Sequence, residues 1–340
     1  MGLFEKAKNN KLTSAEVSSL WFQYMGDSMA ICVYKYFLNI VEDKQIKPIL
    51  EYALQLSEGH VVKITGFLKN ANFQIPIGFT EDDVNVNVPR LFSDQFLLFY
   101  SYIMTIHGVT AYSLAITNAE REDIQNHFFE CTQTSKELFQ KIVEAGKNQP
   151  KFTSVPSIPS PFLPKFEESP GFVSNLIGDK RPLNSSEIST LFFNSRKTGF
   201  NKTLSIAFSQ VAEKEEVRNF MLKNIKLAGK DTESFNAILQ QDYLPLPEKW
   251  DIEITDSTVS PFSDKLMMFH IAFLVNAALS YYGSSIGTSY RTDITLNYSK
   301  VFVHAMEAGA LAYNILVKNG WFEKQPEAID RKSLTEGTDK

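Results

Sequence analysis

The chain has 340 residues, which is enough for two ordinary domains of about 150 residues each. Its formal charge of −5 comes from acidic and basic residues mixed along the chain, which argues against a nucleic acid or an anionic membrane as the partner. An apolar share of 44% with only two cysteines excludes a disordered chain and a disulfide-dependent exported fold. The first residues contain no apolar signal core, so we expect a cytoplasmic protein.

The sequence repeats itself once, with a period of about 170 residues, which is the size of a whole domain rather than of a solenoid unit. The stretch from Lys11 to Phe22 matches the stretch from Pro182 to Phe193, and later matches keep the same order. We therefore predict a first unit at 1–150, a proline-rich linker at 151–170, a second unit at 171–325 and a polar tail at 326–340.

Each unit is predicted to begin with a helix that starts at Thr13 or Asn184. Glu16 and Glu187 follow three residues later and form the pattern of a capping box, in which the side chains and backbone amides of a helix start satisfy each other. Apolar residues then recur at helical spacing.

Three further helices follow in each unit. The second helix covers about 46–72 in the first unit, and prolines Pro76 and Pro247 end the second helices of the two units. A connection of about 15 residues comes next, which favours a crossover between distant ends of a bundle. Third helices are expected at Gln95–Thr117 and Leu266–Thr288, and fourth helices at 120–146 and 290–319. The prediction is an all-α protein made of two tandem ferritin-like four-helix bundles.

The third helices contain no Asp, Glu, Lys or Arg. Both are long enough to span a membrane, but each carries several polar residues, so we interpret them as buried helices rather than as transmembrane segments. We expect them to form the contact between the two units around a pseudo-twofold axis. Homodimerisation through the same surface is the alternative.

The motifs shared by the two units resemble an uncharacterised family of spore-forming bacteria, domain-of-unknown-function family 3231. The resemblance rests on the L-[TN]-S-x-E-[IV] start, the stretch from Ile75 to Val84, the F-S-D motif before each third helix, and the R-x-D-I motif before each fourth helix. It covers nearly the whole chain and implies a ferritin-like fold. Some members are labelled candidate spore coat proteins, which implies an association with the spore.

The first unit offers a candidate metal site. Ferritin-like oxidases use Glu-x-x-His motifs, and this sequence contains none. Helical spacing could nevertheless direct Asp27, His60 and His107 toward one interior region, where a carboxylate and two imidazoles could hold a single metal ion. His127 could join them from the fourth helix. The alternative is a buried polar cluster that satisfies its own hydrogen bonds.

Arg121 and Asp123 recur as Arg291 and Asp293 at the start of the fourth helices. Residues two apart do not face each other on a helix, so we expect each to reach a different partner and to form ion pairs that stabilise the fold.

Phosphate-binding loops, nucleophile elbows and Cys-x-x-Cys motifs are absent from the sequence. This favours a non-catalytic structural or interaction protein whose partners are other proteins, including spore or coat components. The alternatives are a ferritin-like metal-binding protein and a carrier of an apolar ligand held between the third helices.

Overall fold

The computed structural model describes residues 11–147, 149, 151–159, 163, 166–168, 172 and 180–336. The helices of the first repeat are α1 (Ser14–Ile40), α2 (Lys47–Asn70), the short 3-10 helix η2 (Glu81–Asp83), α3 (Asp94–Asn118) and α4 (Glu122–Gly146). Those of the second are α5 (Ser185–Val211), α6 (Glu215–Gln241), η4 (Asp251–Glu253), α7 (Asp264–Thr288) and α8 (Thr292–Lys318), followed by a short α9 (Arg331–Glu336). The all-α prediction is confirmed.

The first helix of each repeat begins with the predicted capping box, and its glutamate has a second role. Glu16 accepts hydrogen bonds from the backbone N–H groups of Glu120 and Arg121, at 3.0 and 2.7 Å. Its counterpart Glu187 accepts from Tyr290 and Arg291, at 3.1 and 3.0 Å. The start of the first helix is thereby fastened to the start of the fourth.

The opposite end of each bundle is fastened by the aspartate of the F-S-D motif. Asp94, at the start of α3, accepts hydrogen bonds from the backbone N–H groups of Glu42 and Asp43, which follow α1. Asp264 does the same for Glu213 and Lys214. Because α3 thus starts beside the end of α1, the connection from α2 must cross the length of the bundle, as the ferritin-like prediction requires.

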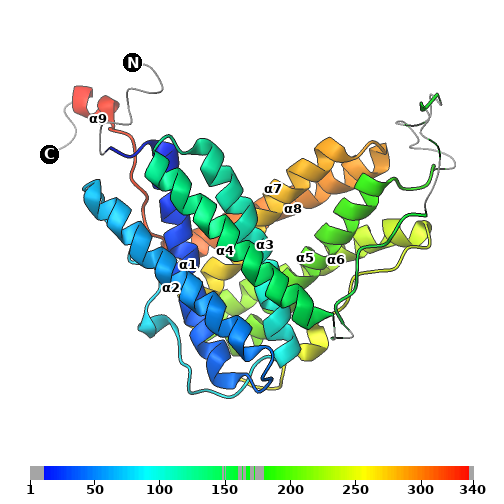
Figure 1. Ribbon diagram of the computed structural model, residues 1–340, viewed down its shortest axis with the longest axis horizontal. Coiled ribbons are helices and arrows are strands. Elements are labelled where there is room, and N and C mark those ends of the chain that lie inside the picture. The colour runs from blue at the N-terminus through cyan, green and yellow to red at the C-terminus, as the bar shows by residue number, and fades with distance from the viewer. Residues whose placement is uncertain are drawn as a thin grey trace.

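The two repeats meet around a pseudo-twofold axis, and their arms diverge from it in a V (Figure 1). Tyr100 of α3 and His270 of α7 occupy equivalent positions, and their Oη and Nε2 atoms lie 3.4 Å apart, close to this axis. Phe96 of α3 stacks on Phe200 of α5, and Phe99 stacks on Trp250. One hydrophobic core therefore continues from the first repeat into the second.

The two crossover connections also bind each other reciprocally. Val84 pairs with Phe262, and the equivalent residues Ile254 and Phe92 pair in the same antiparallel way. The Ser263 hydroxyl donates to Asp83 of η2 at 2.7 Å, and the Ser93 hydroxyl donates to Glu253 of η4. Each repeat therefore supplies a hydrogen-bond acceptor and a backbone pairing partner at the start of the other repeat's third helix.

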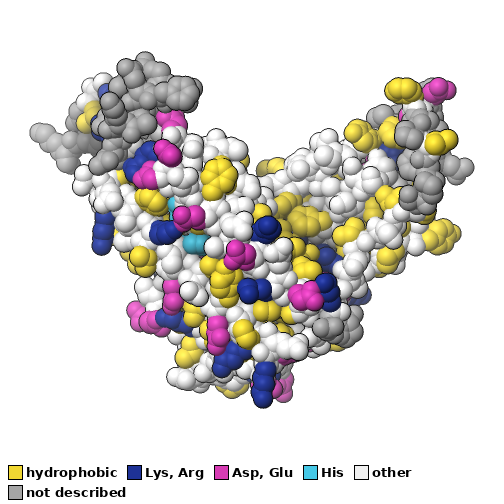
Figure 2. All heavy atoms as spheres, viewed as in Figure 1, with side chains coloured by type: hydrophobic (Ala, Val, Ile, Leu, Met, Phe, Trp, Pro, Cys, Tyr) yellow, Lys and Arg dark blue, Asp and Glu magenta, His cyan; other side chains and the backbone are white. Residues whose placement is uncertain are grey.

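The third helices contact each other through their first halves and, just beyond their midpoints, through the Tyr281–Thr110 hydrogen bond, so the prediction holds for part of their length. Their second halves separate and line the notch of the V (Figures 1 and 2). Within the described chain, α7 alone is apolar and long enough to cross a membrane, and 50% of that apolar window is buried inside the protein.

Residues that flank the helices of the second repeat also contact the rest of the protein. Phe152, at the start of the linker, packs on Trp250, although much of 151–170 lies outside the described residues. After α8, Glu323 accepts hydrogen bonds from the backbone N–H groups of Ile77 and Gly78 in the first crossover, at 2.8 and 2.6 Å. Part of the C-terminal segment is thus held by contacts with the first repeat.

Candidate functional site

The first repeat contains a buried layer of polar side chains between its hydrophobic clusters. Asp27 of α1 faces His60 of α2, with 3.1 Å between Oδ2 and Nδ1. Burial alone would lower the pKa of His60, but the Asp27 carboxylate outweighs burial and, with Cys131, raises it to about 10. At neutral pH His60 is therefore an imidazolium beside Asp27.

The fourth helix adds His127 and Cys131 to this layer. His127 Nε2 lies 2.9 Å from the Gln23 side-chain oxygen, and the Gln23 amide donates to Cys131 Sγ at 3.4 Å. Burial, the neighbouring His60 and Lys63 lower the pKa of His127 to about 4. We assign the neutral tautomer with the proton on Nε2, because the Gln23 oxygen can only accept.

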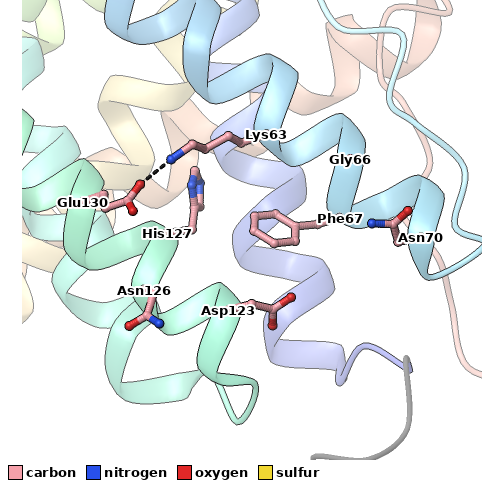
Figure 3. A pocket seen from close by; sticks show the side chains of 8 residues that line it. All are labelled: Lys63, Gly66, Phe67, Asn70, Asp123, Asn126, His127 and Glu130. Atoms are coloured by element: carbon pink, nitrogen blue, oxygen red, sulfur yellow. Dashed lines mark hydrogen bonds and ion pairs between the residues drawn. The ribbon is translucent and has the colours of Figure 1, made fainter.

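A surface groove of about 450 Å³ between α2 and α4 leads to this layer (Figure 3). Its lining residues are Lys63, Gly66, Phe67, Asn70, Asp123, Asn126, His127 and Glu130. Lys63 and Glu130 form an ion pair across it. Of the buried layer, only His127 reaches the groove. Asp27, His60 and the thiol of Cys131 lie behind it, so of this layer a molecule in the groove would meet only the His127 imidazole.

The second repeat has a different polar layer at the same level. Asp231, the counterpart of His60, faces His304 of α8 at 2.7 Å. Thr198 and Tyr282 share a hydrogen bond of 2.8 Å, and Thr198 stands where the first repeat has Asp27. Burial raises the pKa of Asp231, while His304 opposes this rise. The polar chemistry of the layer is therefore not common to the two repeats.

The structure brings together two of the three residues predicted to hold a metal. His107 points instead into the contact between the repeats, where its Nδ1 lies 3.5 Å from Lys197 Nζ. Its ring lies next to Phe273 and Tyr281. Within the described residues, no group of three His, Cys, Asp or Glu side chains is arranged to hold a metal ion. The set of Asp27, His60 and His107 is therefore not assembled.

The recurring arginines and aspartates pair directly with each other, so the expectation that they reach different partners is wrong. Arg121 donates from Nε to Asp123 at 3.0 Å, and Arg291 donates to Asp293 at 3.1 Å. Both arginines are N-cap residues with extended backbone, so the spacing rule for helices does not apply to them. Although burial opposes it, Arg291 and Lys180 lower the pKa of Asp293 to about 2.

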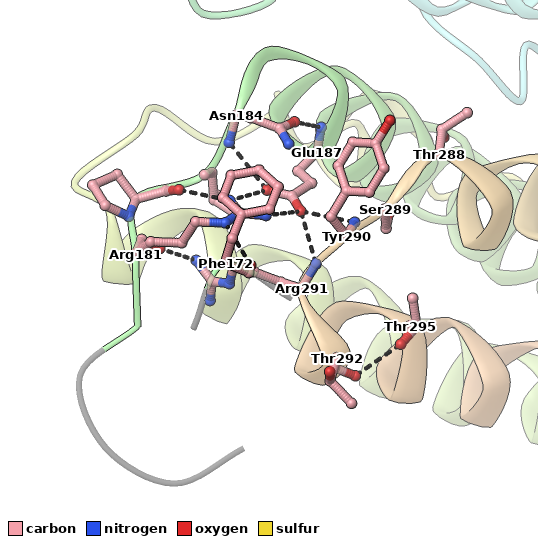
Figure 4. A network of polar contacts seen from close by, with 12 residues as sticks. Phe172, Arg181, Asn184, Glu187, Thr288, Ser289, Tyr290, Arg291, Thr292 and Thr295 are labelled. Carbon is pink, nitrogen blue, oxygen red and sulfur yellow. Dashed lines mark hydrogen bonds and ion pairs between the residues drawn. The ribbon is translucent and has the colours of Figure 1, made fainter. Parts of the chain in front are cut away.

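Around Arg291 the second repeat builds a larger network than the first (Figure 4). Arg181 donates through both terminal nitrogens to Glu187, each at 2.8 Å, and its guanidinium lies 4.2 Å from the Phe172 ring centroid. Burial alone would raise the pKa of Glu187, but Arg181 and the backbone amides lower it. These contacts hold the helix ends of the second repeat together.

Sequence reasoning missed Gln23, Cys131 and Lys197. Gln23 and Cys131 lie on the inward faces of the first and fourth helices, and that spacing could have placed them beside His127. No pattern within one repeat could have placed Lys197 beside His107, because the two residues belong to different repeats.

Comparison with known proteins agrees with the internal repeat. The sequence pattern of the family described as "Protein of unknown function (DUF3231)" matches residues 3–161 and again 171–334. The chain belongs to this family. Its fold is similar to that of a candidate spore coat protein from Bacillus halodurans, with 18% identity and a TM-score of 0.41, over 44% of this chain and 98% of that one. No curated protein matches the chain.

Proposed function

We propose that this protein is a non-catalytic structural or interaction protein that acts through the outer helices of its two repeats, and that it is associated with the spore. The proposal is supported by the structural role of the polar residues that both repeats share. Glu16 and Glu187 bind backbone amides at one end of each bundle, and Asp94 and Asp264 do so at the other. Residues that recur in both repeats therefore serve the architecture.

The residues that do not recur support the same proposal. The Asp27–His60 pair is buried, and the groove between α2 and α4 reaches only His127. A pair that the second repeat replaces with other residues, and that is buried in the first, is suited to holding helices together. The association with the spore rests on the labels of family members that the sequence resembles.

The surface offered to a partner would be the outer face of α2 and α4. It carries the groove beside His127, and a second groove lies near the other end of the same two helices, lined by residues that include Pro48, Ile49 and Lys141. Val62 and Phe129 are exposed on these helices. Figure 2 shows charged side chains of both signs spread over this face among scattered hydrophobic ones, which is typical of a protein surface for transient contacts.

The test is to follow a fluorescent fusion of the full chain through sporulation in the bacterium that encodes it. We expect the fusion to accumulate in sporulating cells and to remain with washed spores. A double change of Val62→Glu and Phe129→Glu should reduce this retention. Ile252→Glu, at an exposed site in η4, is the control that should not. Uniform accumulation in vegetative cells, with none in spores, would contradict the proposal.

A further inference from the structure

Two basic side chains lie against each other at the base of the notch between the repeats. Lys197 of α5 is 8% exposed, and His107 of α3 is 4% exposed. Lys197 Nζ lies 3.5 Å from His107 Nδ1 and 3.2 Å from the centroid of the Tyr281 ring. In the part of the chain that the structure describes, no carboxylate forms an ion pair with Lys197. Buried lysines are normally paired with an anion, which makes the Lys197 ammonium a candidate anion-binding group.

The histidine of this pair is itself incompletely satisfied. His107 Nε2 is buried and has no hydrogen-bond partner among the described residues. Burial, together with Lys197 and His270, lowers the pKa of His107, and burial lowers the pKa of Lys197. An anion placed here would reverse both effects, because it favours the charged form of each base.

The walls above this pair are free of charge. Beyond the hydrogen bond of 3.1 Å between the Tyr281 hydroxyl and Thr110, the second halves of α3 and α7 separate. Exposed positions on these halves are Thr110, Ala111, Ser113, Leu114, Thr117, Asn118, Ser280, Gly283, Ser284, Gly287 and Thr288. Figure 2 shows the hollow between the two arms with hydrophobic side chains on its wall. An uncharged hollow that ends at two buried bases complements a molecule with an apolar chain and an anionic head.

The pseudo-twofold axis supplies an internal comparison. The residues equivalent to Lys197, His107 and Tyr281 are Gly26, Ala277 and Ala111. The two bases and the ring above them are therefore present on only one side of the axis. Since the same helices pack on the other side without them, these three residues are not requirements of the fold.

We propose that Lys197 and His107 bind the carboxylate of a long-chain carboxylic acid, whose apolar chain lies in the notch along the uncharged halves of α3 and α7. The rings of Phe193 and Tyr281 cover the Lys197 ammonium, with centroids 5.1 Å apart. Both rings are only half-buried, so a rotation of either one opens the path from the notch to Lys197. The Tyr281 and Thr110 hydroxyls stand beside this path as further hydrogen-bond donors.

The experiment is calorimetric titration of the full chain with oleate below its micelle concentration, compared with methyl oleate, which lacks the anionic head. We expect one oleate per chain and clearly weaker binding of the ester. Oleate binding should be accompanied by the uptake of about one proton, because the bound carboxylate favours the protonated form of a buried base. This uptake is measured by repeating the titration in buffers with different ionisation heats.

Variants separate the proposed site from non-specific adsorption. Lys197→Met should weaken oleate binding about ten- to hundredfold and reduce the proton uptake, whereas Lys223→Met, at an exposed lysine of α6, should change neither. Leu114→Glu, at a 64% exposed wall position, should weaken binding without affecting folding, and Leu296→Glu on α8 is its control. Absence of oleate binding, or equal binding by Lys197→Met or by the ester, would overturn the proposal.

Discussion

The two repeats share their helix ends and differ in their interiors. At both ends of each bundle the same acidic residues bind the same backbone amides, as Glu16 and Glu187 do beside the fourth helices. Halfway along the helices the first repeat has a charged Asp27–His60 pair. In the second repeat, Thr198 takes the position of Asp27 and is hydrogen-bonded to Tyr282. The connectivity is thus held by contacts that both repeats keep, whereas the central layer differs between them.

The largest expected effect comes from removing a shared helix-end contact. Glu187→Ala leaves Arg181 without its buried partner and removes the acceptor for the backbone amides of Tyr290 and Arg291. We expect the free energy of unfolding to fall by about 3–5 kcal/mol. Urea denaturation of the full chain measures it, and Glu215→Ala, at an exposed position of α6, should stay within about 0.5 kcal/mol.

That loss should also depend on pH with a definite sign. The folded-state pKa of Glu187 is lowered, so its contribution to stability is present above the ordinary pKa of a glutamate and disappears as the pH falls through the folded-state value. The difference between wild type and Glu187→Ala should therefore shrink in acid. A difference that stays constant down to strongly acidic pH would contradict this account of the contact.

The second prediction isolates the charged layer of the first repeat. Because the pKa of His60 is raised to about 10, the stability from its pair with Asp27 is fully present below about pH 6.5 and is lost as the pH rises toward 10. We expect an alkaline loss on the order of 3 kcal/mol in wild type that is absent in His60→Gln. His304→Gln, in the second repeat, should retain the alkaline loss.

A third prediction compares equivalent positions of the fourth helices. His127 is bonded to Gln23, whereas the buried side-chain nitrogen of Asn297 has no partner among the described residues. His127→Leu should therefore destabilise the protein by about 1–2 kcal/mol, while Asn297→Leu should be neutral or stabilise it by up to about 1 kcal/mol. Thermal unfolding of both variants measures this contrast, and equal losses would show that the two positions are alike.

The smallest expected effect concerns the ends of the second helices. Asn72 and Tyr243 are equivalent residues, and both adopt a positive φ, near 57° and 55°. Asparagine tolerates this conformation better than tyrosine does, and the Tyr243 side chain is 97% exposed. Tyr243→Asn should stabilise the protein by about 0.5–1 kcal/mol, and the reverse change Asn72→Tyr should cost a similar amount. Opposite signs in paired denaturation curves would confirm the comparison.

The fold could be predicted because its signals are local or repeated. Capping patterns at Thr13 and Asn184 mark helix starts, prolines mark the crossovers, and the duplication shows which motifs recur. The candidate site could be predicted only in part. Helical spacing brings Asp27 to His60, but whether His107 faces its own bundle or the neighbouring repeat depends on how the repeats dock, which no local pattern records.

The reciprocal binding of the two crossovers has a consequence for the folding of a single repeat. A single repeat, expressed alone, would lack the acceptors for its Ser93 or Ser263 hydroxyl and would leave the face around Tyr100 or His270 open to water. It could bury that face only by meeting another molecule, so its folding would depend on concentration. Joining both halves in one polypeptide makes the encounter intramolecular, and the assembled state then persists at any dilution.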